Sequence, residues 1–319
     1  MKMIHKFTIL LTALTSLLAI VVASAIFYIT TPIDVSSKTL KLPKGSIANT
    51  INHLQNRGYA LSKIDTYILA AIGYPKSGEL TIDKGLYNRI DFLHKLTSAT
   101  EAFDIITLIP GETLPIFLQE ISKTYSLSYQ KLEGNYTRYS PYKEAGILPE
   151  TYHVPKGIKE EKLISFLVKL TEEKYEKLAK EYLQKYDKTK WLRYLTIASI
   201  IQKEAANKEE MPIVASVIYN RLKKEMPLQM DGALNYGEYS HVKITPQRIR
   251  TDKSRFNTYL NTGLPPYPVC SVSIDAIKAA LQPSDTNYLY FMKNKNGTHD
   301  FTHSYQEHLR NIAKAKKDQ

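Results

Sequence analysis

An apolar segment near the N-terminus constrains the fold of this chain more than any other feature. The run FTILLTALTSLLAIVVASAIFYI, residues 7–29, contains no charged side chain. A helix of this length crosses the roughly 30 Å hydrocarbon core of a bilayer. We therefore predict a transmembrane helix at residues 7–29, preceded by a cytoplasmic tail at residues 1–6.

The same segment has one alternative interpretation, a signal peptide that is cleaved from the mature protein. Ala23-Ser24-Ala25 resembles the small-residue site of a cleaved signal peptide, but the apolar part of a signal peptide is shorter, about 7–15 residues. We favour an uncleaved anchor, and the cleaved form stays open. Because Lys2 and Lys6 precede the run, we expect a single-pass protein of the cytoplasmic (inner) membrane whose C-terminal bulk is extracytoplasmic or periplasmic.

The charge of the chain indicates an anionic partner. Lys and Arg exceed Asp and Glu by 43 to 31, a formal net charge of +12. Such a surface attracts polyanions. The basic residues are spread along the chain and accompany no recognised nucleic-acid-binding motif, so an anionic envelope polymer or a lipid headgroup fits as well as nucleic acid, and charge alone does not decide between them. The single cysteine, Cys270, excludes an internal disulfide and a cysteine-rich metal site.

After the anchor, the residue pattern predicts an α+β protein in three parts. Residues 30–102 contain short strands and amphipathic helices after a polar linker at residues 30–37, and form a small α+β module. Residues 103–188 form a middle α+β segment that ends in a long, highly charged helix with a solvated face. Residues 189–319 have the densest apolar periodicity outside the anchor, so we expect a mixed α+β catalytic domain there.

Within the third part, two helices follow one another at about residues 190–206 and 212–224. A long stretch punctuated by Pro and Gly comes next, and then a strand at NYLYFM and a closing helix at residues 304–317. Long irregular segments in compact domains are often functional. We therefore expect substrate contacts from this stretch.

One carboxylate in the first of these helices is out of place. Ile197, Ile200, Ile201 and Glu204 are spaced i, i+3, i+4 and i+7, which puts them on one helix face. A carboxylic acid against isoleucines is costly to ionise, so its pKa rises and it keeps a proton near neutral pH, as a general acid must. Spacing by itself favours a simpler alternative, a solvated Glu204 that pairs with Lys208 at the helix end.

Other polar residues are candidates to face a cleft near this helix. Pro212 begins the second helix, which should pack against the first. Asn220 and Arg221 lie near its C-terminal end, where an arginine also complements the helix dipole. Gln229 and Asp231 lie on one side of an extended segment and would suit sugar hydroxyls or an acetamido group, although position and residue type by themselves favour an ordinary polar loop edge.

The irregular run FNTYLNTGLPPYP at residues 256–268 supplies further candidates. Asn257 and Tyr259 are placed to face a substrate, while Gly263 and the pair that begins with Pro265 stiffen the loop. These assignments rest on residue type and position alone.

No metal or cofactor is expected. His299, His303 and His308 invite a metal site, but their spacing of four and then five suits one helix poorly, and no zinc signature is present. The sequence also lacks a GxSxG motif, a phosphate-binding P-loop and a dinucleotide fingerprint. Serine hydrolases, P-loop enzymes and dehydrogenases are therefore unsupported.

An ordered series of motifs connects the chain to a known family. It comprises LPKGS, GLY, IPGET and GILPETY, followed by SIIQKEA, VASVIYNRL, LQMD, NYG, FNTY, GLPP, LYF and GTHDF. The series resembles the endolytic murein transglycosylase family, also called MltG or YceG-like, along the whole chain. The resemblance implies that residues 30–102 form a LysM-like module.

The resemblance also implies an activity. Members of this family cut glycan strands of peptidoglycan internally, at the MurNAc–GlcNAc β-1,4 bond, and leave 1,6-anhydro-MurNAc ends without a cofactor. The catalytic glutamate corresponds to Glu204, acting first as general acid and then as base. Gln202 stands in place of the first glutamate of the family's E-K-E pattern, which indicates that this first glutamate is dispensable. The substrate-binding positions expected here are Asn220, Arg221, Gln229, Asp231, Tyr236, Asn257, Tyr259 and Pro265.

One departure and two alternatives accompany this prediction. After GLPP the chain reads YPVCSVS, whereas the family commonly has Gly-Pro and Asn-Pro-Gly turns. In a non-catalytic, membrane-anchored peptidoglycan-binding or scaffold protein, Glu204 would be a structural residue. A hydrolytic muramidase would use Asp231 as a second carboxylate.

The expected partners are peptidoglycan strands and the cytoplasmic membrane, with peptidoglycan synthases as further candidates and no nucleic acid.

Overall fold

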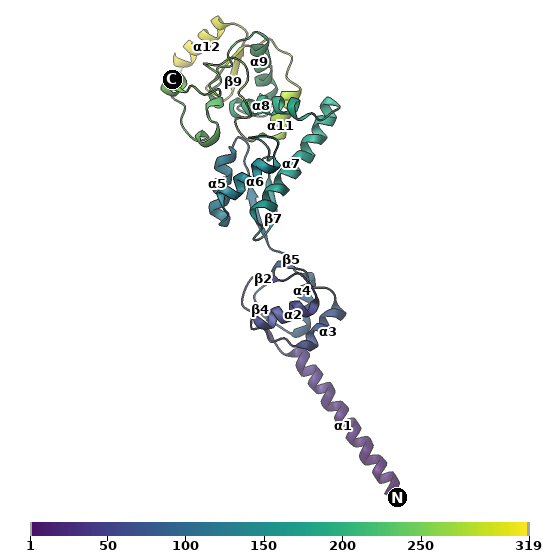
Figure 1. The fold of residues 1–319 in the computed structure, drawn as a ribbon. Coiled ribbons are helices and arrows are strands. Elements are labelled where there is room, and N and C mark those ends of the chain that lie inside the picture. Colours follow the sequence, from purple (N-terminus) through teal and green to yellow (C-terminus); the bar gives the residue numbers. More distant parts are fainter. Residues whose placement is uncertain (1, 318–319) are drawn as a thin grey trace. The chain divides into compact units, whose positions relative to one another are not determined.

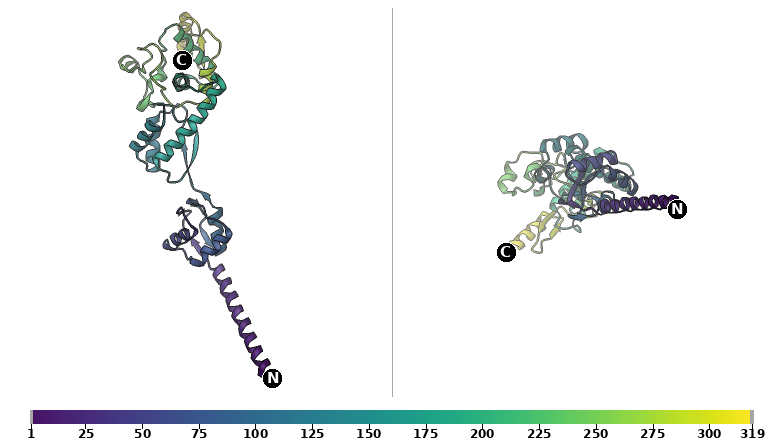
Figure 2. Two further views of the ribbon diagram at one scale, coloured as in Figure 1. Left: turned by 45° about the vertical axis from the view of Figure 1, so that its right-hand side comes forward. Right: turned by 90° about the horizontal axis from the view of Figure 1, so that it is seen from below.

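The computed structural model describes residues 2–317, which form two compact units (Figures 1 and 2). The smaller unit comprises the chain up to residue 104 together with residues 153–157. The larger unit comprises residues 105–152 and the chain from residue 158 onward. Helices and strands occur in both units, so the predicted α+β class is confirmed.

The N-terminal helix α1 (Lys2–Thr30) contains the predicted membrane-spanning run. Its residues 4–30 have a mean hydropathy of 2.5, and the helix is long and apolar enough to cross a membrane. Large apolar side chains such as Phe7, Leu14 and Leu18 are exposed along it. By length and composition α1 fits a single-pass anchor.

Short antiparallel strands and three helices make up the rest of the smaller unit. The strands are β1 (Ile33–Val35), which pairs with β4 (Gly85–Tyr87), and β2 (Thr39–Leu42), which pairs with β3 (Gly78–Thr81), itself paired with β5 (Thr100–Glu101). The helices are α2 (Ile47–Asn56), α3 (Lys63–Ile72) and α4 (Arg89–Ser98). Leu54, Leu69 and Phe92, one from each helix, are fully buried in the common core.

The polar linker predicted at residues 30–37 is wrong for its central part. Ile33 and Val35 lie in β1 and are buried in the core of the smaller unit, while Asp34 between them is exposed. This alternation is the two-residue period of a strand with one buried face. Three residues were too few for the pattern to stand out beside the polar residues around them.

The larger unit begins with part of a two-stranded ribbon, which it shares with the smaller unit, and three helices. Strand β6 (Phe103–Thr107) pairs with β7 (Thr151–Pro155), and the chain passes between the two units along this ribbon. The helices are α5 (Leu114–Tyr125), α6 (Tyr129–Tyr139) and α7 (Glu160–Leu183). One face of α7 is buried, since Leu163, Leu167 and Tyr175, which recur at helical spacing, are inaccessible to solvent. Only the opposite face of the helix is solvated.

The main core surrounds α8 (Lys188–Glu204), which packs against α9 (Met211–Lys223) and α11 (Ile274–Leu281) (Figure 1). The two helices predicted at about 190–206 and 212–224 are confirmed within two residues, and Pro212 occupies the first turn of α9. Helix α11 lies in the stretch predicted to be irregular. Its Ser273 cap accepts a hydrogen bond from the Ala276 amide, a signal that the sequence offers but that we did not use.

Shorter elements complete the larger unit around this core. They are the 3-10 helices η1 (Asp231–Leu234) and η2 (Gly237–Tyr239), α10 (Pro246–Thr251), the hairpin β8 (Tyr290–Lys293) and β9 (His299–Thr302), and α12 (Tyr305–Lys317). The predicted strand in NYLYFM and the closing helix are therefore confirmed.

Candidate active site

A pocket of about 450 Å³ lies in the larger unit, and we call it the Glu204 pocket. Its walls come from the ends of α8 and α9, the segment that follows α9, the irregular loop near residue 259, and the β8–β9 hairpin with α12. The side chains that line it are Glu204, Arg221, Leu228, Gln229, Asp231, Tyr259, Tyr290, Phe291, Met292, Lys293, His299, Tyr305 and His308.

Glu204 is the last residue of α8, where the apolar face of the helix reaches the pocket. The isoleucines one and two turns before it, including Ile197 and Ile201, are fully buried, whereas Glu204 is partly exposed. The alternative pairing with Lys208 is not what the structure shows. The Lys208 ammonium instead contacts Asp275, with 2.5 Å between Nζ and Oδ2.

The surroundings of Glu204 favour its protonated form. Burial raises its pKa to about 7, and the negative charge of Asp231 acts in the same direction. A hydrogen bond of 2.7 Å from the Gly232 amide to Oε1 partly opposes them. The position at the C-terminal end of α8 adds a further reason, since the helix dipole is negative there. Near neutral pH, Glu204 is therefore able to give a proton and to take one back.

Gly232 must be a glycine because the backbone passes very close to the end of α8. A Cβ atom at this position would lie 2.5 Å from Cβ of Lys203 and 3.0 Å from Oε1 of Glu204. The first distance is far below van der Waals contact and involves an atom next to the backbone, which a rotamer change does not remove. The short hydrogen bond to Glu204 therefore depends on the absence of a side chain.

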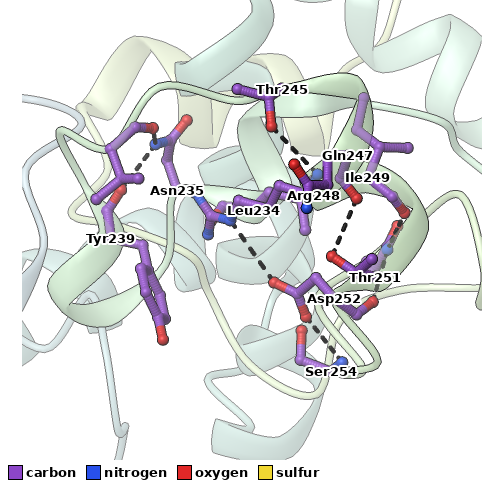
Figure 3. A network of polar contacts seen from close by, with 12 residues as sticks. Leu234, Asn235, Tyr239, Thr245, Gln247, Arg248, Ile249, Thr251, Asp252 and Ser254 are labelled. Carbon is purple, nitrogen blue, oxygen red and sulfur yellow. Dashed lines mark hydrogen bonds and ion pairs between the residues drawn. The ribbon is translucent and has the colours of Figure 1, made fainter.

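A polar network braces the loop that carries Gly232 (Figure 3). Arg248 of α10 donates to the Leu234 carbonyl and approaches Asp252, with 3.8 Å between Nε and Oδ2. The side-chain amide of Asn235 donates to the carbonyls of Tyr239 and Val242, at 2.8 and 2.9 Å. These bonds hold the residues that follow η1. They therefore stabilise the turn from which the Gly232 amide donates to Glu204.

Asp231 and Tyr259 form a pair on the pocket wall. The Tyr259 hydroxyl donates a 2.6 Å hydrogen bond to Oδ1 of Asp231, and burial together with this bond raises the pKa of Tyr259. The neighbouring Thr258 is buried and ties the two segments together. Its hydroxyl accepts from the Met230 amide at 3.0 Å and donates to the Met230 carbonyl at 3.2 Å.

Arg221 lines the pocket but uses its donors on the protein itself. The guanidinium donates to the carbonyls of Leu289, Pro227 and Leu228, at 2.6, 2.8 and 3.0 Å. It also reaches the Gln229 side chain at 3.2 Å. Arg221 therefore joins the segment after α9 to the segment that leads into β8, and its positive charge remains at the pocket.

The pocket brings together five of the nine predicted site residues, namely Glu204, Arg221, Gln229, Asp231 and Tyr259. The other four lie outside its described lining. Asn220 donates to the carbonyls of Thr286 and Tyr288, and Asn257 donates to those of Ile249 and Asp252. Tyr236 stacks on Phe256 with 4.1 Å between ring centroids, and Pro265 is buried.

Sequence reasoning assigned no site residue to the β8–β9 hairpin or to α12. Tyr290, Phe291, His299, Tyr305 and His308 from these elements line the pocket. The available signal was the pair of motifs LYF and GTHDF on either side of the hairpin turn. We considered the histidines only as metal ligands and so overlooked them as pocket residues.

A buried carboxylate fastens this hairpin to the end of α8. Oε1 of Glu210 accepts from the His299 amide at 2.8 Å, and Oε2 accepts from Nδ1 of His299 at 2.7 Å and from the Ala206 amide at 3.2 Å. Burial would raise the pKa of Glu210, but the His299 and Ala206 bonds hold it below its usual value. Because Ala206 is two residues after Glu204, this clamp sets the distance between the catalytic candidate and the hairpin.

We predict that Glu210→Gln loosens the β8–β9 hairpin. The amide keeps one acceptor but loses the charge that binds His299, at a cost of about 1–3 kcal/mol in the free energy of unfolding. Amide hydrogen exchange at residues 290–302 should accelerate, and Trp191, the only tryptophan and fully buried in this unit, should report the lower stability. The neighbouring, exposed Glu209→Gln is the control. Equal exchange in both variants would contradict the clamp.

We predict opposite effects of alanine at two glycines of the larger unit. Gly232→Ala should destabilise it by about 1–3 kcal/mol, because the new methyl group overlaps the end of α8. Gly134→Ala, at an open position within α6, should stabilise it by about 0.5–1 kcal/mol. Chemical unfolding followed by Trp191 fluorescence compares them. A neutral or stabilising Gly232→Ala would show that the close approach is not required.

Comparisons with known proteins show which family this chain resembles in sequence and in structure. The YceG-like family model matches residues 40–314. A crystal structure of a YceG-like protein from Listeria monocytogenes is similar with a TM-score of 0.57 and 25% identity, over 85% of this chain and 97% of that one.

Curated relatives match a shorter part of the chain. An endolytic murein transglycosylase of Bacillus subtilis is 39% identical over 156 residues, which is 49% of this chain and 42% of the relative. One of Streptococcus pneumoniae is 36% identical over 125 residues, 37% of this chain and 23% of the relative. The matches thus span less than half the length of either relative. The family model extends over most of the sequence, and the chain therefore belongs to the YceG-like family.

Proposed function

We propose that this protein is a lytic transglycosylase that cuts peptidoglycan strands internally, at the MurNAc–GlcNAc β-1,4 bond, and leaves 1,6-anhydro-MurNAc ends. The observation that carries the proposal is Glu204, a carboxyl group with a pKa raised to about 7 in a pocket of about 450 Å³. The names of the two curated relatives support the same substrate.

One carboxyl group suffices for this chemistry. Protonated Glu204 donates its proton to the glycosidic oxygen as the bond to the MurNAc anomeric carbon breaks. The resulting carboxylate then takes the proton from the C6 hydroxyl of the same MurNAc, whose oxygen closes on the anomeric carbon. The proton lost in the first step is regained in the second, and neither water nor a cofactor is consumed. A pKa near the working pH suits both steps.

Neighbouring groups have distinct parts in this scheme. The Gly232 amide holds Oε1 of Glu204, which leaves Oε2 as the oxygen that carries the proton. The negative charge of Asp231 helps Glu204 to stay protonated and would stabilise the positive charge that develops at the anomeric carbon. Tyr259 orients Asp231 through its hydroxyl and acts as a positioning residue.

The pocket wall suits a carbohydrate. Tyr259, Tyr290, Phe291 and Tyr305 place aromatic rings along it, and such rings combine a flat apolar face with, in tyrosine, a polar tip. Sugar rings have apolar faces and polar edges, so they match this lining better than a purely aliphatic pocket would. With Lys2 and Lys6 on the cytoplasmic side of α1, the pocket would lie outside the membrane, where the glycan strands are.

Products from defined glycan strands test the proposal. Full-length protein in detergent is incubated with purified, uncrosslinked strands, and the fragments are analysed by mass spectrometry. We expect internal fragments with 1,6-anhydro-MurNAc ends, and a loss of rate of about 10²–10⁴-fold in Glu204→Gln. Glu144→Gln is the matched control, because burial also raises the pKa of Glu144 to about 7 but this residue lies outside the Glu204 pocket.

Three outcomes would contradict the proposal. Reducing ends in place of anhydro ends would identify a hydrolytic muramidase, with Asp231 as the second carboxylate. Strands that bind but stay intact with both wild type and Glu204→Gln would identify a peptidoglycan-binding or scaffold protein. Equal losses of rate in Glu204→Gln and Glu144→Gln would show that the effect comes from a buried charge and not from the pocket.

A further inference from the structure

The end of the membrane helix is built into the smaller unit. Near the C-terminus of α1, the Tyr28 hydroxyl donates to Oδ2 of Asp65 at 2.8 Å and contacts the Ser62 hydroxyl, both at the start of α3. The Arg89 guanidinium of α4 lies over the Tyr28 ring, 4.0 Å from its centroid, and donates to the Tyr28 carbonyl at 2.9 Å. Helix α1 is therefore fastened to two other helices at its last turn.

A buried ion pair holds this junction. Asp65 and Arg89 are almost completely buried, with 2.7 Å between Oδ2 and Nη1. A buried charge that loses its partner is strongly unfavourable, which keeps the two residues together. The connection between α1 and the strand that follows it is short, because β1 begins at Ile33, three residues after the end of α1. The smaller unit is therefore attached to the end of α1 by side-chain contacts as well as by the chain.

Four exposed apolar side chains surround this junction, and we call them the apolar collar. They are Ile64, Tyr67, Leu86 and Ile90, with exposed fractions of 56, 77, 73 and 36%. Ile64 lies between the two α3 residues that contact Tyr28, and Tyr67 follows it one helical turn later on the same face. Leu86 is paired with Asp34, four residues after α1, and Ile90 is next to Arg89.

Single exposed apolar residues are ordinary, but a group gathered around a membrane helix is not. If residues 7–29 span the hydrocarbon, Tyr28 lies at the membrane interface, where aromatic side chains concentrate. We propose that the apolar collar rests in the interfacial layer of the bilayer, so that the smaller unit is docked on the membrane surface from which α1 emerges. The occupant of this surface is lipid, because the collar residues lie in α3, α4 and β4, which contact the last turn of α1 or pair with the strand that directly follows it.

This docking would restrict the orientation of the smaller unit toward the bilayer, which a flexible linker after α1 would not do. The unit is held at the membrane by two attachments, the helix and the collar, so its orientation toward the bilayer is fixed. The inference concerns the smaller unit and α1, and it is independent of the chemistry proposed for Glu204.

Site-directed fluorescence tests the proposal in the full-length protein. Cys270, the single native cysteine, is fully buried, so cysteines introduced at exposed positions accept a nitrobenzoxadiazole label selectively. Tyr67→Cys and Leu86→Cys probe the apolar collar. Tyr74→Cys is the matched control, since Tyr74 is 84% exposed but lies beyond the other end of α3, roughly 15 Å from Ser62 along the helix. Leu17→Cys within α1 is the positive control.

Each labelled protein is reconstituted into liposomes with nitroxide-labelled lipids, and quenching by lipid is compared with quenching by iodide in the water. We expect labels at positions 17, 67 and 86 to be quenched by the lipid nitroxide at least three times more than the label at position 74. Iodide should show the reverse order. Labels at 67 and 86 that match position 74 in both assays would overturn the proposal. So would a label at position 17 that lipid does not quench, because the collar then has no membrane beside it.

Discussion

The contact between the Glu204 carboxyl and the Gly232 amide is the interaction around which the larger unit is arranged. It joins the end of α8, in which residues 195–201 are buried, to a turn that has no side chain at the point of contact. Burial raises the pKa of Glu204, so the folded protein binds a proton that the unfolded chain releases. The free energy of unfolding therefore falls as the pH rises from the usual glutamate pKa, 4.5, to about 7. Such a cost is expected at a functional site.

Three separate attachments hold the walls of the pocket at a fixed distance from this carboxyl. The network around Arg248 holds the turn that carries Gly232 (Figure 3). Thr258 fastens the segment that leads to Asp231. Glu210 joins the end of α8 to the hairpin through His299. Thr258 and Glu210 are buried and Arg248 is partly buried, and each makes at least one hydrogen bond to a main-chain atom of another segment.

The elements that the sequence predicted well are those with long, regular apolar patterns. Helices α1, α8 and α9 have such patterns, and Pro212 marks the start of α9. Glu204 stood out because its spacing relative to the isoleucines is a local property of one helix. Strand β1 and helix α11 were missed because three or eight residues carry too little periodicity amid polar and Pro-rich neighbours.

The assembly of the pocket was harder to predict, since it depends on which segments meet in space. Asn220 and Asn257 have the residue type of a sugar-binding group, yet their side-chain amides donate to main-chain carbonyls, that of Thr286 at 66 positions for Asn220 and that of Ile249 at 8 positions for Asn257. His299 has the residue type of a metal ligand, yet its partner is Glu210, 89 positions away in the sequence. No spacing rule links such residues. The raised pKa of Glu204 likewise requires burial from several elements together, which one helix cannot supply.

A direct titration of the Glu204 carboxyl group tests the central claim most closely. Glutamate labelled with ¹³C at the side-chain carboxyl would be incorporated into the full-length protein, and the NMR signal absent from Glu204→Gln would be followed against pH. This subtraction separates Glu204 from Glu144, whose pKa is also raised to about 7. We predict a midpoint of about 7 for the signal that Glu204→Gln removes. A midpoint near 4.5, the value of an ordinary glutamate, would mean that Glu204 is ionised at neutral pH and cannot be the general acid.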